Sequence, residues 1–400
     1  MTDIATRLAT WADALGSASQ EVAAEDVALA QRSLVDTVAV TLAARSHPLG
    51  QAARVLSEPG RWAVLGHVLD FDDLHMPSTT HVSVVCVPAV LAAGGDARAY
   101  LAAAGVMARL GTALGWPHYA AGWHATCTAG APAAAVAAAS SWGLSVRQTA
   151  VAIALAVPAA GGVQRAFGSD AKSLQVGFAA EAGLRAARLA RAGADADTSA
   201  VDAWLPLVGG DVARLDTESG APALPDGLAI KIYPACYALQ RPISALAGLG
   251  IATGDVTRIV ARSPVATVAP LIHHRPTTGL QGKFSLEYAC ATALLDAHQG
   301  FASFADDAVR RAEAQRLVRL VEIQLTPGGN GLLSGAFEAE VYTGRGVETA
   351  WLDLPPGAPR RPPTPEQLAA KVTDCLGGLT LDPQSWTWST AADVLREHLG

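Results

Sequence analysis

Four alanine-rich segments in the first half of the chain most constrain how it can fold. Glycine, proline or aspartate separates them, and most of their side chains are small and apolar. Half of all residues are apolar but only 6% are aromatic, so the apolar share comes mainly from alanine, leucine and valine, which favours close-packed helices over a β-sandwich. We therefore predict a dense helical layer over these segments, which are Val84–Ala93, Tyr100–Leu114, Ala131–Trp142 and Val146–Val157.

The second half of the chain has a different pattern. Residues alternate between apolar and polar in Val256–Ala261, Leu317–Leu325 and Phe337–Tyr342, which predicts strands, with a helical pattern over Phe284–Leu295 between them. Because 400 residues exceed what one hydrophobic core usually serves, we expect two domains. The predicted fold class is mainly α, and its two parts are a large helical domain of residues 1–226 and 361–400 and a smaller α+β domain of residues 227–360.

Charge, cysteine content and hydropathy exclude several classes of protein. The net charge of -7 comes from 36 acidic and 29 basic residues with no basic block, so we expect no nucleic-acid partner. The five cysteines include no CxxC pair, which favours a reduced, cytoplasmic compartment over a disulfide framework or a structural zinc site. Apolar residues of segment 4–15 recur at helical spacing and predict a docking helix, not a signal peptide. The uncharged span 125–146 is broken by Pro132, so we expect no membrane insertion.

Carboxylates and imidazoles cluster between residues 70 and 81. An unpaired buried charge loses its hydration, so such a cluster beside apolar runs must pair, bind a metal or bind a ligand. One hypothesis is a metal-dependent helical enzyme, because these side chains suit divalent ions. The cluster lacks the further acidic residue of aspartate-rich magnesium signatures and no second such motif follows, so we expect no metal. The five candidate ligands are Asp70, Asp72, Asp73, His75 and His81.

Two lysines and a further histidine stand in neutral surroundings. Lys172 has only Asp170 nearby and Lys231 has no acidic neighbour, which suggests that their partner comes from outside the chain. His124 directly precedes a helical pattern. Two lysines that converge with His81 and His124 on a cavity would suit a small substrate with two or three carboxylates.

These stretches together resemble the MmgE/PrpD family, which includes 2-methylcitrate dehydratase, cis-aconitate decarboxylase and iminodisuccinate epimerase. The resemblance runs along nearly the whole chain. The stretches that carry it are His67–His81 (HVLDFDDLHMPSTTH), Gly122–His124, Gly168–Gly177, Lys231–Cys236 and Phe284–Tyr288.

The resemblance implies a large all-helical domain, a smaller α+β lid, an active site in the cleft between them, a homodimer and no cofactor. We expect the homodimer to form through residues 84–114 and 131–157, because an alanine-rich layer leaves one broad apolar face uncovered. The site positions that the resemblance suggests are Asp70, His81, His124, Lys172, Lys231 and Tyr288. We expect His124, His81, Asp70 and Tyr288 to be catalytic, and Lys172, Lys231 and Cys236 to bind the substrate.

The reaction implied is that of a lyase acting on a small di- or tricarboxylate by acid/base catalysis. Dehydration, decarboxylation and epimerisation all handle charge next to a carboxylate, so each needs cations and a group that moves a proton. We expect a 2-methylcitrate-dehydratase-like dehydration, with His124 as the main acid/base and with Lys172 and Lys231 on the substrate carboxylates. The alternatives are a cis-aconitate-type decarboxylase, an epimerase or isomerase, and, from another class, a non-catalytic carboxylate-binding module.

The preference for dehydration comes from departures within the family pattern. Cys236 matches the dehydratase-like branch, and Leu74 stands where decarboxylase relatives carry a threonine. Gln175 and Gln240 stand where histidine is usual, and Val82 replaces a proline. The connection between Leu56 and His67 is about twenty residues shorter than usual for the family.

Overall fold

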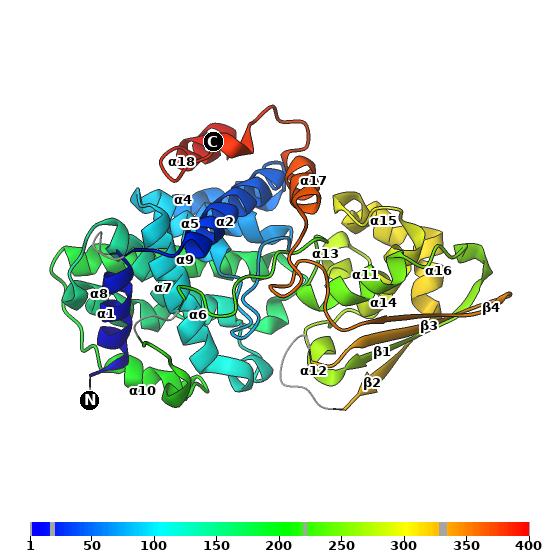
Figure 1. Cartoon of the computed structure of the whole chain (residues 1–400), viewed down its shortest axis with the longest axis horizontal. Coiled ribbons are helices and arrows are strands. Elements are labelled where there is room, and N and C mark those ends of the chain that lie inside the picture. Colours follow the sequence, from blue (N-terminus) through cyan, green and yellow to red (C-terminus); the bar gives the residue numbers. More distant parts are fainter. Residues whose placement is uncertain (1, 17–20, 219–221, 328–333, 400) are drawn as a thin grey trace. The chain divides into compact units, whose positions relative to one another are not determined.

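The computed structural model describes residues 2–16, 21–218, 222–327 and 334–399, whose contacts divide the chain into two units (Figure 1). The sequence places residues 361–374 with the helical domain, whereas their contacts assign them to the second unit. A lid function for the second unit stays a prediction. The first unit consists of Met1–Arg165, Asp170–Leu228 and Cys375–Gly400, and the second of Ala166–Ser169 and Ala229–Asp374.

The first unit is helical, and the alanine-rich segments form helices as predicted. Its helices are α1 (Ile4–Gly16), α2 (Ala24–Ala43), α3 (Leu49–Ala52), α4 (Glu58–Val68), α5 (Ser83–Ala93), α6 (Ala97–Ala120), α7 (Ala125–Ser141), α8 (Val146–Ala156), α9 (Asp170–Arg191), α10 (Ala200–Leu207) and α18 (Ala391–Leu399), and α17 (Pro365–Leu376) ends in it.

Helix α7 lies at the centre of this unit. It packs against α5, α6, α8 and α9, and every residue from Ala125 to Ala139 is buried. Small side chains allow this close packing: a Cβ at Gly183 of α9 would lie only 2.4 Å from the Ala131 carbonyl oxygen of α7. On its other side α9 meets α4, where a Cβ at Gly177 would lie 2.6 Å from the Gly60 carbonyl oxygen. Helix α9 is therefore held at backbone contact between α4 and α7.

The N-terminal docking helix is confirmed. Helix α1 buries its apolar positions against α6 and α8, with Trp11 on its buried face. Among the helices that the structure describes, none is long and apolar enough to cross a membrane.

The prediction that the dimer forms through an uncovered apolar face is wrong. Most residues of segments 84–114 and 131–157 are buried within the chain itself, because α1, α2, α4 and α9 cover them. The alanine-rich layer therefore leaves no broad apolar face there, and the homodimer stays a prediction without that support.

The second unit is a four-stranded mixed sheet with helices. The strand order is β2-β1-β3-β4, in which β1 pairs parallel with β2 and antiparallel with β3, and β3 pairs antiparallel with β4. The strands are β1 (Val256–Pro264), β2 (Val321–Thr326), β3 (Phe337–Thr343) and β4 (Gly346–Leu352), and the helices are α11 (Gln240–Ala247), α12 (Val265–Val268), α13 (Gly279–Gly282), α14 (Leu286–Leu295), α15 (Asp306–Arg310) and α16 (Ala312–Leu320).

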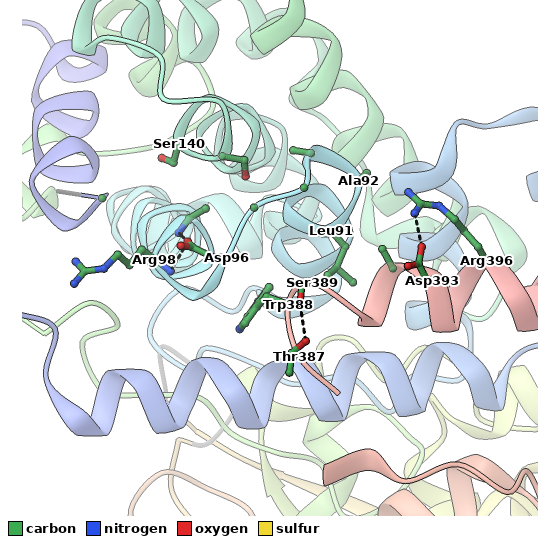
Figure 2. A pocket seen from close by; sticks show the side chains of 17 residues that line it. Leu91, Ala92, Asp96, Arg98, Ser140, Thr387, Trp388, Ser389, Asp393 and Arg396 are labelled. Atoms are coloured by element: carbon green, nitrogen blue, oxygen red, sulfur yellow. Dashed lines mark hydrogen bonds and ion pairs between the residues drawn. The ribbon is translucent and has the colours of Figure 1, made fainter. Parts of the chain in front are cut away.

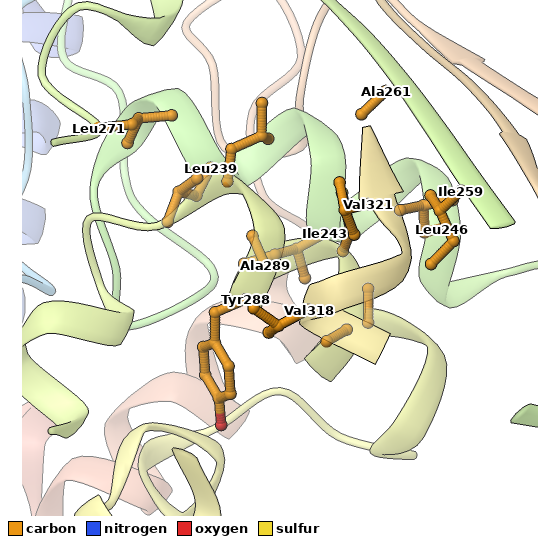
Figure 3. Close-up of a cluster of buried hydrophobic side chains, with 14 of the residues drawn as sticks. Leu239, Ile243, Leu246, Ile259, Ala261, Leu271, Tyr288, Ala289, Val318 and Val321 are labelled. Carbon is orange, nitrogen blue, oxygen red and sulfur yellow. The ribbon is translucent and has the colours of Figure 1, made fainter. Parts of the chain in front are cut away.

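A single hydrophobic core joins the sheet to α11, α14 and α16. Figure 3 shows Ile243 and Leu246 of α11 near Ile259 of β1, with Ala289 of α14 and Val318 of α16 beside them. These side chains are all buried. Packing of helices on a sheet is what the α+β prediction requires.

The strand prediction needs two corrections. Residues 317–320 end helix α16, and the strand begins only at Val321, because Leu317 and Val318 form the buried face of an amphipathic helix. The sequence analysis also missed β4, in which Ala350 alone is buried. An edge strand exposed on both faces has no alternating pattern to detect.

The glycine contact between α7 and α9 predicts the effect of a substitution. Gly183→Ala should lower the free energy of unfolding by about 1–3 kcal/mol, because a Cβ would press on the α7 backbone and outweigh the roughly 1 kcal/mol gain in helix propensity. Gly130→Ala is the matched control, since its new Cβ would meet only side-chain atoms at 3.3–3.6 Å. Urea denaturation of both variants checks this, and equal stabilities would contradict it.

Candidate active site

The aspartate-rich stretch leaves helix α4 through a left-handed turn. The Asp70 amide donates to the His67 carbonyl at 2.9 Å, and Asp70 has a φ of +54°. This is the position after a helix C-cap that glycine usually fills, and aspartate is one of the few other residues that tolerate it. The turn buries Asp70 beside the last turn of α4, where His67 is also buried. Two side chains three residues apart thus share one buried site.

Lys172, in the first turn of α9, completes this group. Its Nζ lies 2.9 Å from Asp70 Oδ1 and 2.8 Å from His67 Nε2, and the lysine is only 4% exposed. The expectation that the partner of Lys172 comes from outside the chain is therefore wrong. Its carboxylate partner lies 102 positions away in sequence, which is why no local pattern revealed it.

Asp72 lies between two imidazoles. His67 Nδ1 donates to Asp72 Oδ2 at 2.7 Å, and His81 Nδ1 is at ion-pairing distance from the same oxygen, 3.1 Å. Burial by itself would raise the pKa of Asp72, but the two imidazoles outweigh burial and hold the pKa well below its usual value. Burial lowers the pKa of His67 to about 4. The Asp72 carboxylate raises this pKa, but the Lys172 charge acts together with burial to lower it. At neutral pH Asp72 is therefore a carboxylate and His67 a neutral ring.

The three imidazoles are in contact. The His67 and His81 rings meet edge to face with centroids 4.7 Å apart, and the His67 and His124 rings stack at 5.8 Å. The side chain of His81 is 12% exposed, whereas His124 is 1% exposed. Burial holds the pKa of His124 well below its usual value, and a proton on His124 would also be opposed by any proton on His67 and by the Lys172 ammonium. His81 is thus the more accessible ring of the two candidates.

His124 sits at the N-cap of α7, and its Nδ1 lies 2.8 Å from the Gln175 amide nitrogen of α9. Its backbone amide donates to the Gly162 carbonyl at 3.0 Å. The packing of α4, α7 and α9 therefore brings together five of the residues discussed, which are His67, Asp70, His124, Lys172 and Gln175.

The remaining members of the acidic cluster face elsewhere. Asp73 accepts hydrogen bonds from the backbone amide and the hydroxyl of Ser83, and His75 contacts the Ser78 hydroxyl and the Pro225 carbonyl oxygen at 2.7 Å. The five candidate metal ligands therefore do not converge.

One smaller group has the spacing of a metal site. Among the described residues, His67, Asp70 and His81 have ligand atoms within 4.8 Å of one another. However, the Lys172 ammonium contacts both His67 and Asp70. Because a divalent ion bound there would meet this charge at close range, the group fits an internal ion pair better than a metal site.

Three expected site residues belong to the second unit. Lys231 is fully buried, and Gln240 holds the loop that follows it by accepting from the Ile232 and Tyr233 amides. The Cys236 amide donates to the Lys283 carbonyl oxygen. The Tyr288 hydroxyl donates to the Ser303 carbonyl oxygen within the hydrophobic core. Their roles at the site stay predictions.

A large cavity of the first unit lies elsewhere, at the C-terminal end of α5 (Figure 2). It encloses about 1010 Å³, and among the described residues none of the candidate site residues lines it. Its charged groups already have partners: Arg396 pairs with Asp393 and Glu58, and Asp96 caps α6. We do not assign it to the site.

Sequence reasoning gave His67 no role and named Asp72 only as a candidate metal ligand, not as a partner of the imidazoles. The spacing of His67, Asp70 and Asp72 at a helix end is the signal that could have found them, because a left-handed turn after the helix brings such residues to one point. Gln175 was noted only as a departure from the family pattern. No local feature of the sequence shows that its amide meets His124.

The chain belongs to the MmgE/PrpD family. The model of the MmgE/PrpD N-terminal domain matches residues 60–204, and that of the MmgE/PrpD C-terminal domain matches residues 233–387. A similar protein is the cis-aconitate decarboxylase of Aspergillus terreus, which is 25% identical over a match of 366 residues in length; 78% of this chain and 72% of the relative are covered. The resemblance inferred from the sequence is therefore confirmed.

Asp73 predicts a pH-dependent stability. Burial raises the pKa of Asp73 to about 7. The Ser83 hydrogen bonds lower this pKa, and the charges of Asp36 and Asp72 raise it further. Between about pH 4 and pH 7 the folded state keeps a proton that the unfolded chain loses. This group therefore lowers the free energy of unfolding as pH rises, by up to about 1.4 kcal/mol per pH unit. Asp73→Asn mimics the protonated form and should remove this loss.

The measurement is the difference in unfolding free energy between Asp73→Asn and the wild type from pH 4.5 to pH 8. The low pKa of His67 changes stability in the opposite direction over part of this window, but it does so in both proteins and cancels. The difference should grow in favour of the variant as pH rises. A difference that does not change with pH would contradict the prediction.

Proposed function

We propose that this protein is a lyase that acts on a small di- or tricarboxylate. In this proposal buried cations bind the substrate and an imidazole moves the proton. The observation that carries the proposal is the buried Lys172 ammonium, which contacts His67 and Asp70. The His67 ring in turn contacts the rings of His81 and His124. A polyanionic substrate needs a fixed positive charge next to a proton-transfer group, and this cluster supplies both.

Membership of the family and the similarity to a cis-aconitate decarboxylase support a carboxylate substrate. Within that class we propose dehydration of the 2-methylcitrate type, because Cys236 matches the dehydratase-like branch of the family and Leu74 replaces the threonine of decarboxylase relatives. Decarboxylation and epimerisation are the alternatives. Lys231 is the second carboxylate-binding lysine of this proposal.

The geometry favours His81 for proton transfer, although the sequence analysis gives this role to His124. A general base needs access to the substrate and a group that orients it. His81 is the more exposed ring, and the Asp72 carboxylate lies 3.1 Å from its Nδ1. A carboxylate there stabilises the imidazolium that forms when Nε2 takes a proton.

A substrate panel tests the reaction. The protein is incubated with 2-methylcitrate, citrate, cis-aconitate and iminodisuccinate, and the products are followed by NMR. Dehydration is expected, seen as loss of water from a hydroxy acid. Carbon dioxide with itaconate would instead mean decarboxylation, and no turnover of any polycarboxylate would overturn the proposal.

Asp72→Asn tests the proton-transfer group. The amide cannot stabilise a His81 imidazolium, so kcat should fall by about 10²- to 10⁴-fold with little change in KM. Asp73→Asn is the matched control, because Asp73 faces Ser83 and not an imidazole, and it should keep near-wild-type kcat at neutral pH. Both are assayed below their melting temperatures, and equal kcat values for the two variants would contradict the assignment.

A further inference from the structure

Gln175 is anchored by both backbone groups of Val163. The Gln175 amide oxygen accepts from the Val163 amide at 3.0 Å, and the Gln175 amide nitrogen donates to the Val163 carbonyl at 3.2 Å. A backbone N–H can only donate and a backbone C=O can only accept. These two bonds therefore fix which end of the side-chain amide is oxygen and which is nitrogen, a choice that the shape of the group alone does not decide.

The same amide nitrogen lies 2.8 Å from His124 Nδ1. An NH₂ group has hydrogens to donate and no capacity to accept, so His124 Nδ1 must accept through its lone pair. In a neutral imidazole the hydrogen then resides on Nε2. An imidazolium would set an Nδ1–H against the Gln175 N–H, so the glutamine also opposes protonation of this ring.

Most of the charged groups around His124 act in the same direction, and the Asp72 carboxylate, which favours an imidazolium, is outweighed by them and by burial. The Cys127 thiol lies 3.3 Å from the same Nδ1, and burial raises its pKa, so it remains a protonated thiol. The Lys172 ammonium and the N-terminal end of α7 both place positive charge near the ring, which disfavours an imidazolium.

We propose that Gln175 is a positioning residue that keeps His124 neutral with its hydrogen on Nε2, so that His124 donates a hydrogen bond to an oxygen of the carboxylate substrate and does not exchange a proton. The tautomer follows from the resting protein alone, and only the step to the substrate rests on the proposed function. A neutral imidazole that polarises an oxygen stabilises the negative charge that develops on it, as in triosephosphate isomerase.

His81 and His124 would then differ in their hydrogen positions. A carboxylate faces Nδ1 of His81, and an amide N–H faces Nδ1 of His124. The first arrangement favours a hydrogen on Nδ1 and leaves Nε2 to accept a proton, whereas the second favours a hydrogen on Nε2. One ring is suited to act as a base and the other as a hydrogen-bond donor.

NMR of the whole protein tests the tautomer directly. Histidine is labelled with ¹⁵N, a two-bond ¹H–¹⁵N correlation spectrum is recorded near pH 7.5 without substrate, and the His124 signals are identified by their loss in His124→Asn. The expected pattern is a protonated Nε2 and an unprotonated Nδ1. A hydrogen on Nδ1, or an imidazolium at this pH, would overturn the proposal.

Gln175→Glu tests whether the glutamine sets this state. The carboxylate can still accept from the Val163 amide, but it presents an acceptor to His124 Nδ1, so the spectrum should change to an Nδ1–H tautomer or an imidazolium. Gln164→Glu is the matched control, because Gln164 bonds the Tyr119 and Trp123 carbonyls of the same loop region and not the His124 ring. The control should keep the wild-type tautomer, and an unchanged spectrum in Gln175→Glu, or the same change in both variants, would overturn the role of Gln175.

Activity supplies a separate readout. On a substrate that the protein turns over, Gln175→Glu should lower kcat by about 10²- to 10³-fold, as for loss of a donor to a developing oxyanion, and should shift the pH profile. Unchanged kcat and pH profile would overturn the catalytic part. A wild-type Nε2–H tautomer in a protein that turns over no polycarboxylate would support the role of Gln175 while contradicting the proposed function.

Discussion

The buried ion pair between Lys172 and Asp70 is the interaction on which the site depends. The lysine is 4% exposed and the aspartate 2%, so each would lose its hydration at a cost of several kcal/mol if the other were absent. The pair joins the turn after α4 to the first turn of α9 across 102 positions of sequence. It forms only when α9 is docked, and backbone contact at Gly177 and Gly183 is what lets α9 approach α4 and α7 so closely.

Two different partners hold the two candidate imidazoles. A carboxylate that faces one ring nitrogen attracts a hydrogen there, and an amide N–H that faces the corresponding nitrogen repels it. Asp72 and Gln175 therefore give His81 and His124 different chemical characters, although both are histidines within one cluster. The stacked His67 ring accepts a hydrogen bond from Lys172 and donates one to Asp72, so both of its ring nitrogens are engaged.

Much of the fold could be predicted because its signals are local. Alanine-rich segments between glycines and prolines define α5 to α8, and the apolar spacing of residues 4–15 defines α1. The prediction was wrong where a helix face imitates strand alternation, at residues 317–320, and where an edge strand has no buried face, at β4. The dimer face failed for another reason: periodicity shows that a helix has an apolar surface, but not which part of the same chain covers it.

The sequence by itself determined the mainly helical fold, the family, and the residue types that gather at the site, since spacing and composition act within a few turns of the chain. Only the tertiary structure decided which of these groups meet. The sequence predicts that Lys172 binds a partner from outside the chain, but in the structure it pairs with Asp70. In the sequence Gln175 is only a departure from the family pattern, whereas in the structure helix α9 places its amide next to His124. The physical reason is that ion pairs and hydrogen bonds act over about 3 Å, a distance that only the packing of α4, α7 and α9 imposes on residues so far apart in sequence.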